Sequence, residues 1–383
     1  MENVIKLTGR IDSNNSTEIE EKINKEVDKF LPNDEIVLDA SNLEYISSAG
    51  LRIILRLKKR NDTTKVINCN SEIYDIFDMT GFSQMMEVSK KMREISVDGC
   101  EVIGDGFYGT VYRIDPETIV KVFKFPDSIN DIKREQGLAK KAFVMGIPTA
   151  IPYDIVKIGN LYGSVFELLD AESIAKSINK GENIDDFAKN SVEILKKMHS
   201  TKVDPNELPS RKEQVIKLAK YCEDFLPPDT ADKLIKLLET IPETYTMLHC
   251  DFHIKNIMRQ NGELLLIDMD TLSFGHPIFE FGGMYATYQG FSCVNKNNPK
   301  EFLGISYENS THIWDSTFRQ YYCDKSEEEL KDIQKKISII SYLQILYLRE
   351  KFNNPGYNVF QEEIDFCKKY LEENVKDLDT LEY

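Results

Sequence analysis

The sequence predicts an α/β domain over residues 1–92, followed by an α+β domain of two lobes over residues 96–383. In the first ninety residues, short apolar runs alternate with helical patterns, which is typical of a small sheet covered by helices. From residue 96 to about residue 168 one strand pattern follows another, with a single helix among them, and beyond that point helical patterns dominate. We therefore expect an antiparallel-sheet N-lobe and a mainly helical C-lobe in the second domain.

Composition excludes several classes of protein. The formal net charge of −16 argues against nucleic-acid binding, which needs a basic surface. The seven cysteines are scattered and form no CxxC, so neither a disulfide framework nor a zinc site is expected. No basic region precedes an apolar stretch at the N-terminus, and the most apolar segment, 337–348, is too short to cross a bilayer. We expect a cytoplasmic protein with no membrane or nucleic-acid partner.

The elements of the first domain follow from its periodicity. Ser16–Leu31 has helical spacing and ends at the Pro32-Asn33-Asp34 break. Ser71 is the expected N-cap of a helix over Glu72–Met79, which Gly81 ends. The other expected elements are strands at Val4–Leu7, Glu35–Asp39 and Lys65–Cys69 and a helix at Leu51–Lys59.

One loop of this domain is specific enough to suggest a family. Ser47-Ser48-Ala49-Gly50-Leu51 joins a strand to a helix, and Gly9-Arg10-Ile11-Asp12 and Met79-Thr80-Gly81-Phe82 lie near the two ends of the domain. Together these segments resemble the STAS domain of bacterial anti-sigma factor antagonists over residues 2–90. The resemblance implies a regulatory or docking domain that binds a protein partner.

Ser47 and Ser48 allow two interpretations. In switch members of the STAS family, a loop serine at the helix N-terminus is phosphorylated, where free amides and the helix dipole favour a phosphate. Here the usual acceptor position holds Ala49, with Ser48 and Ser47 one and two residues earlier. The two serines are therefore either a phosphoswitch or only caps of the helix that begins near Ala49.

A glycine-rich hairpin opens the second domain. Gly104, Gly106 and Gly109 form a GxGxxG, and a strand pattern follows the last glycine, whereas a dinucleotide fold would need a helix there. A turn at 115–117 then leads to the strand Thr118–Phe123, which carries Lys121. This order is typical of a kinase nucleotide-binding lobe, in which glycines let the backbone approach phosphates.

Lys121 requires a partner because it lies in the middle of an apolar strand. Glu135, on the helix expected over Ser128–Met145, is the best candidate, with a solvated helix face as the alternative. Strands expected at Ile151–Ile158 and Tyr162–Leu168 would lead to a hinge. We expect backbone groups at Glu167 and Leu168 in that hinge to meet the nucleotide base.

A third stretch, Met247–Asp270, supplies oxygen ligands at the tips of two apolar runs. Asp251 follows the first run, Asn256 comes five residues later, and Asp268 ends the second run. We expect these three side chains to meet in one small volume. These side chains suit phosphoryl transfer. One carboxylate would orient a hydroxyl, and the amide and the second carboxylate would hold Mg²⁺.

Residues 96–383 resemble the aminoglycoside phosphotransferase and choline kinase family, which has a bilobal protein-kinase-like fold. The resemblance implies that Asp251 orients the acceptor hydroxyl, that Asn256 and Asp268 bind Mg²⁺, and that Lys121, held by Glu135, binds the nucleotide phosphates. The resemblance also implies that Asp270 supports the metal cluster without being one of its main ligands. His249 is expected to be structural, and His253 to bond the loop backbone. This sequence has Cys250 where the family usually has glycine, and Glu280 where it usually has aspartate.

These patterns predict a phosphotransferase that uses ATP (or GTP) and Mg²⁺ and has the hydroxyl (alcohol) group of a small molecule as acceptor. Two alternatives remain. One is a kinase that phosphorylates a serine of its own STAS domain or that of a partner in sigma-factor signalling. The other is a non-catalytic scaffold that senses nucleotides. The identity of the acceptor does not follow from the sequence.

Overall fold

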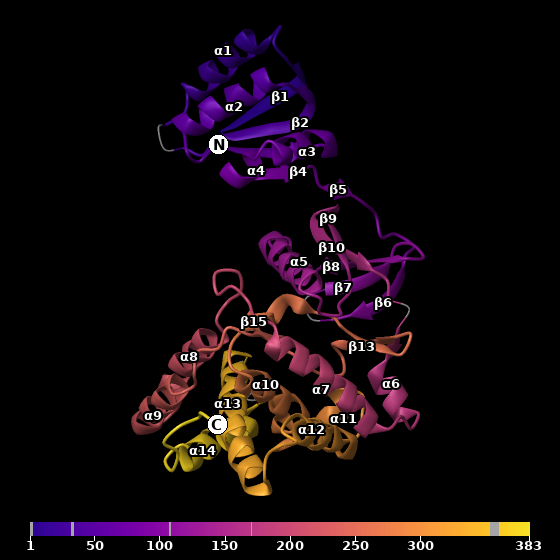
Figure 1. Ribbon diagram of the computed structural model, residues 1–383, viewed down its shortest axis with the longest axis vertical. Coiled ribbons are helices and arrows are strands. Elements are labelled where there is room, and N and C mark those ends of the chain that lie inside the picture. Colours follow the sequence, from indigo (N-terminus) through magenta and orange to yellow (C-terminus); the bar gives the residue numbers. More distant parts are fainter. Residues whose placement is uncertain (1–2, 32–33, 107–108, 170, 353–359) are drawn as a thin grey trace. The chain divides into compact units, whose positions relative to one another are not determined.

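A sheet of four parallel strands forms the N-terminal unit of the computed structural model, which describes residues 3–31, 34–106, 109–169, 171–352 and 360–383 (Figure 1). Chain contacts define this unit as residues 1–96 with 155–160, and a second unit as 97–154 with 161–383. The strands pair in the order β1-β2-β3-β4: Val4–Ile11, Val37–Ile46, Lys65–Cys69 and Val88–Lys90. The Pro32-Asn33 break predicted from the sequence lies outside the described residues.

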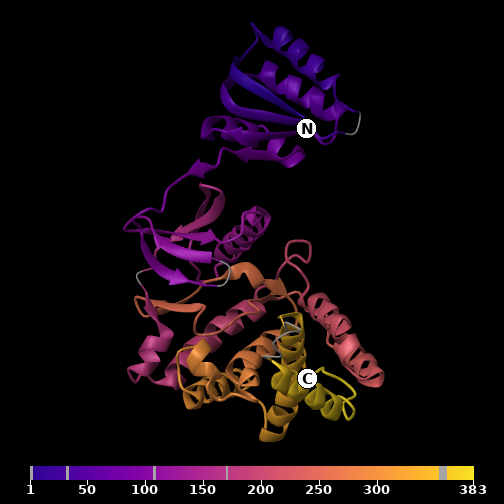
Figure 2. The ribbon, with the colours of Figure 1, turned by 180° about the vertical axis from the view of Figure 1, so that it is seen from behind.

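The helices of this unit are α1 (Ser16–Val27), α2 (Ser48–Arg60), α3 (Ser71–Met79) and the short α4 (Phe82–Met85). Asn70, and not Ser71, caps α3, because its Oδ1 accepts the backbone N–H of Ile73 at 2.8 Å. The prediction failed because both residues are good caps and adjacent, so local sequence does not separate them. Figures 1 and 2 show α1 beside α2.

Four strands of the second unit pair in antiparallel fashion in the order β10-β8-β7-β6. They are Leu161–Glu167, Thr118–Phe123, Gly109–Arg113 and Glu101–Asp105. On β8, Val120 and Val122 are buried on one face of the sheet, and Lys121 between them lies on the other face. Helix α5 (Ile129–Val144) packs against β10. The strand β9 spans Pro152–Ile158, and the two-residue β5 (Arg93–Glu94) pairs with it in parallel.

The remainder of the second unit is mainly helical. Its longest helix, α13 (Glu327–Phe352), has an almost continuously buried centre and packs against α8 (Arg211–Cys222), α10 (Ile278–Tyr288) and α14 (Gln361–Asn374) (Figure 1). The other helices are α6 (Ile174–Asn179), α7 (Ile184–Ser200), α9 (Pro228–Glu239), α11 (Asn298–Phe302) and α12 (Tyr307–Tyr321). None of the helices in the described ranges is long and apolar enough to cross a membrane.

Short strands within the helical lobe position the predicted motif. The hairpin β13 (Ile257–Gln260) and β14 (Glu263–Leu266) pairs with β11 (Glu172–Ser173). The two-residue β12 (Met247–Leu248) pairs with β15 (Ser273–Phe274). The loop between β12 and β13 therefore carries Asp251 and Asn256, while Asp268 follows β14.

Candidate active site

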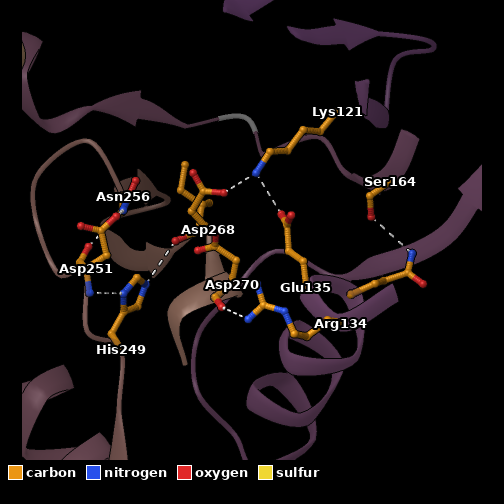
Figure 3. A network of polar contacts seen from close by, with 11 residues as sticks. Lys121, Arg134, Glu135, Ser164, His249, Asp251, Asn256, Asp268 and Asp270 are labelled. Atoms are coloured by element: carbon orange, nitrogen blue, oxygen red, sulfur yellow. Dashed lines mark hydrogen bonds and ion pairs between the residues drawn. The ribbon is translucent and has the colours of Figure 1, made fainter. Parts of the chain in front are cut away.

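Lys121 makes the central contacts of the candidate site. It lies on β8 between the buried Val120 and Val122. Its Nζ lies 3.0 Å from Oε1 of Glu135 on α5 and 2.5 Å from Oδ1 of Asp268 (Figure 3). The predicted ion pair with Glu135 is confirmed. The second ion pair, with Asp268, was not predicted and joins the two lobes.

The charged groups in this cluster shift one another's pKa values. Burial raises the pKa of Glu135 to about 7, because the charged carboxylate loses its hydration; Lys121 opposes this shift and the Asp268 carboxylate adds to it. For Lys121, burial acts to lower the pKa, but attraction by Glu135 and Asp268 is stronger and raises it above its usual range. Lys121 is therefore a permanent cation in this cluster.

The loop after β12 is held by a buried carboxylate. Glu280 on α10 is fully buried and accepts the backbone N–H groups of His249 at 2.6 Å and Cys250 at 2.9 Å. Cys250 has φ = 67°, a left-handed conformation that favours glycine. This geometry explains why glycine is common at the position in the family that the sequence resembles. Here the two bonds to Glu280 hold a non-glycine residue in that conformation.

Both carboxylate oxygens of Asp251 have partners within the loop. Asn256 Nδ2 donates to Oδ2 at 2.8 Å and to the Asp251 carbonyl at 3.0 Å. His253 Nε2 lies 3.2 Å from Oδ1, and the His253 carbonyl accepts the Asn256 N–H at 2.8 Å. His253 therefore bonds the loop backbone through its own backbone, while its side chain contacts Asp251. Burial alone would raise the pKa of Asp251, but the hydrogen bonds and positive charge from His253, with help from His249 and Asn256, lower it below its usual range. Asp251 is therefore ionised.

His249 supports this loop, whereas Asp270 is bonded to helix α5. The buried His249 has Nε2 at 3.2 Å from the Ile267 carbonyl, and its Nδ1 accepts the Asp251 N–H at 3.3 Å, in keeping with the structural role that was expected. The Asp270 carbonyl accepts a bond from Arg134 at 3.0 Å. Burial raises the pKa of Asp270, and repulsion from the Asp268 carboxylate adds to the shift.

The β13–β14 hairpin links Asn256 to the segment that carries Asp268, two of the three residues predicted to supply oxygen ligands. The N–H of Ile267 donates to the Asn256 carbonyl at 2.9 Å, which ties the residue before Asp268 to Asn256. Asp251 contacts Asn256 directly, whereas Asp268 contacts Lys121. No group of three His, Cys, Asp or Glu side chains converges as a metal site within the described ranges.

A cavity of about 470 Å³ lies beside this cluster, within the size range of small-molecule sites. Its walls include Lys121, Glu135 and Asp268, together with Glu167 and Leu168 of the predicted hinge. The Leu168 N–H is not free to bond a nucleotide base, because it donates to the Glu117 carbonyl at 2.7 Å. The apolar part of the lining includes Ile103, Val111, Ile119, Phe166, Met258 and Ile267.

The three predicted glycines differ in their surroundings. Gly104 lines the cavity. The Gly106 N–H donates to the Gly109 carbonyl at 2.9 Å, which holds these two glycines together. A Cβ at Gly109 would lie only 2.7 Å from the Val122 carbonyl oxygen, so close strand packing requires glycine there.

Sequence reasoning missed several residues of the site. Ser173, Lys255 and Met258 line the cavity, and Glu280 holds the loop. For Lys255, the available signal was its place next to Asn256 in the motif. For Glu280, the signal was its acidic character at a position that the resemblance marks as acidic.

Comparisons with known proteins assign the two parts of the chain to two families. A sequence profile described as "Phosphotransferase enzyme family" matches residues 99–295, and a profile described as "STAS domain" matches residues 2–95. BtrV of Bordetella bronchiseptica, named as an anti-sigma factor antagonist, is 32% identical over 87 residues. That alignment covers 22% of this chain and 73% of BtrV.

Solved structures share the fold. The ADP-bound aminoglycoside phosphotransferase APH(2'')-Ib is similar with a TM-score of 0.50 and 16% identity, covering 79% of this chain and 98% of its own. A thermostable mutant of aminoglycoside phosphotransferase APH(4)-Ia is similar with a TM-score of 0.50 and 12% identity, covering 72% and 94%. At such identities the likeness shows a common fold.

Proposed function

Because the chain belongs to the phosphotransferase enzyme family and carries a STAS domain, we propose that it transfers the terminal phosphoryl group of ATP (or GTP) to a hydroxyl group of a small molecule. In this proposal residues 96–383 are the phosphotransferase domain, and residues 1–92 are a regulatory domain that docks a protein partner.

The double ion pair of Lys121 is the observation that carries the proposal. Lys121 and Glu135 come from a strand and the helix that follows it, and Asp268 comes from a loop 147 positions after Lys121, yet all three meet at the wall of one cavity. Holding a partly buried lysine between two carboxylates costs desolvation energy, and such groups are commonly retained where a function needs them. Phosphate recognition is the function that suits a fixed cation beside an apolar base-sized cavity.

The donor set fits Mg²⁺. Asn256 directs its amide nitrogen to Asp251, so its Oδ1 is turned away from that carboxylate and is available as a ligand. Asp268 adds a carboxylate. Magnesium in nucleotide sites uses one or two protein oxygens and completes its shell with phosphates and water, so a cluster of three carboxylates is not required. When bound, Mg²⁺ would neutralise charge on the phosphates.

Asp251 would act on the acceptor. Its ionised carboxylate accepts a hydrogen bond from the acceptor hydroxyl and takes up the proton as the new oxygen–phosphorus bond forms. The bond between the transferred phosphorus and the bridging oxygen breaks, and its electron pair leaves on the diphosphate. His253 and Asn256 keep the carboxylate in one orientation.

Asp251→Asn tests this function. The variant keeps the shape of the side chain but loses the base, so we expect ADP release in the presence of Mg²⁺, ATP and an acceptor to fall by about 100-fold or more. Nucleotide affinity should stay within about twofold, because Asp251 does not line the cavity. Panels of amino alcohols, aminoglycosides and sugars supply the acceptors. Full activity in Asp251→Asn would refute the assignment.

A second candidate function concerns the STAS domain itself. Ser48 is exposed in the first turn of α2, whereas the Ser47 hydroxyl accepts the Ala49 N–H at 3.2 Å as the N-cap. These positions favour Ser48 as the acceptor of a phosphate and Ser47 as a cap. The chain would then phosphorylate Ser48 of its own STAS domain or the equivalent serine of a partner.

Labelled ATP separates these functions. Label on the protein that disappears in Ser48→Ala and persists in Ser47→Ala supports the STAS substrate. Release of ADP that depends on an added small molecule supports the first function. Binding of nucleotide with neither outcome supports a nucleotide-sensing scaffold.

A further inference from the structure

The loop that carries Asp251 and Asn256 also presents a cation whose charge no other described side chain neutralises. Lys255 is exposed, lines the cavity and has no carboxylate within ion-pair distance among the described residues. The cavity has one other cationic side chain among its described lining, Lys121, which is neutralised by Glu135 and Asp268.

The local structure fixes the direction of Lys255. The residues on either side of it, Ile254 and Asn256, are buried, and the Ile254 N–H donates to the Tyr288 hydroxyl at 3.0 Å. The loop is therefore anchored on both sides, and the intervening side chain points out of the protein core.

An aromatic ring holds the ammonium group. Lys255 Nζ lies 4.7 Å from the ring centroid of Phe302 on α11, within the range of a cation–π contact. Phe302 leaves 44% of its surface exposed, and its ring also packs edge-on against His253 at 5.5 Å. A π face orients a cation without cancelling its charge. Lys255 is thus held in place and remains available to an anion.

We propose that Lys255 binds the terminal phosphoryl group that the enzyme transfers. This inference rests on the proposed phosphotransferase function and adds a residue to it. Lys255 adjoins Asn256 and shares a loop with Asp251, which would hold the acceptor hydroxyl. A cation on this loop faces the phosphoryl group that moves, whereas Lys121 belongs to the opposite lobe. A positive charge there stabilises the negative charge that the transfer spreads over the phosphoryl oxygens.

Calorimetric titration of the full chain with Mg²⁺ and two nucleotides tests the assignment. The non-hydrolysable analogue AMP-PNP carries a terminal phosphoryl group and ADP does not. For Lys255→Met, we expect the affinity for AMP-PNP to fall by about 10-fold or more, as for loss of a charged contact, while the affinity for ADP stays within about twofold. Lys255→Arg keeps the charge and should restore the affinity for AMP-PNP to within about threefold.

Lys296→Met is the matched control. Lys296 Nζ also lies over a ring, 5.3 Å from the centroid of Tyr307, but Lys296 does not line the cavity. Its removal should change neither affinity. If Lys255→Met lost the same affinity for AMP-PNP as for ADP, or lost affinity for neither, the role assigned to Lys255 would be overturned while the proposed function would stand. Wild-type protein that binds neither nucleotide would overturn the proposed function, and the assignment with it.

Discussion

The variant Glu280→Gln tests whether the Glu280 carboxylate holds the loop between β12 and β13 in place. The carboxylate is fully buried, and each oxygen accepts one backbone N–H, from His249 at 2.6 Å and Cys250 at 2.9 Å. Glutamine has nearly the same shape, but it offers one oxygen and one NH₂ group. One of the two N–H groups would then face a donor.

The expected loss in the free energy of unfolding follows from these two hydrogen bonds. A buried N–H left without an acceptor costs about 1–3 kcal/mol, and the remaining bond loses its charge assistance, which costs about 1 kcal/mol more. We therefore expect the free energy of unfolding to fall by about 2–4 kcal/mol. Cys250, at φ = 67°, would also be free to relax, and this would displace the adjacent Asp251. Turnover should fall by about 10-fold or more, since small misplacements of catalytic groups are costly.

The assay uses the sole tryptophan of the chain. Trp314 is buried in the same unit, and its ring lies 6.2 Å from that of Phe281, the residue after Glu280. Urea unfolding followed by tryptophan fluorescence therefore reports on this unit. Glu280→Asp, which keeps both oxygens, is the control and should lose less stability. A loss below about 0.5 kcal/mol in Glu280→Gln would refute the reasoning, because it would mean that neither N–H depends on the charge.

Three further outcomes are expected. Gly50→Ala should destabilise the N-terminal unit by about 1–3 kcal/mol, because its Cβ would lie 2.7 Å from Ile46 Cγ1 and 2.8 Å from Ile11 Cγ2. Circular dichroism would show this loss, and an unchanged melting curve would contradict it. Asp268→Ala should abolish the strengthening of nucleotide binding by Mg²⁺, measured by titration with and without the metal; a preserved metal effect would exclude Asp268 as a ligand. Because the pKa of Glu135 rises from 4.5 to about 7 on folding, the folded state binds the proton more tightly. Stability should therefore decline as pH rises from about 4.5 to about 7, and this slope should be absent in Glu135→Gln.

Regular, strongly patterned elements could be predicted from the sequence with their bounds. The strands Thr118–Phe123 and Lys65–Cys69 match the structure at both ends. Helix α12 was not predicted, because Asn309, Ser310 and Thr311 favour non-helical hydrogen bonds and mask its apolar face. Its stability comes from buried contacts such as that of Trp314 with Phe281, which no local pattern reveals.

The sequence by itself selected the side chains of the candidate site. Residue type and short spacing were enough to select Lys121, Asp251, Asn256 and Asp268, because a metal and a phosphate restrict which side chains can serve them. Only the tertiary structure decided how these groups meet. The Lys121–Asp268 pair joins residues 147 positions apart, and Glu280 reaches back about 30 positions to hold His249 and Cys250. Contacts of this kind depend on how the lobes and helices pack, and packing is a property of the whole chain rather than of any short stretch.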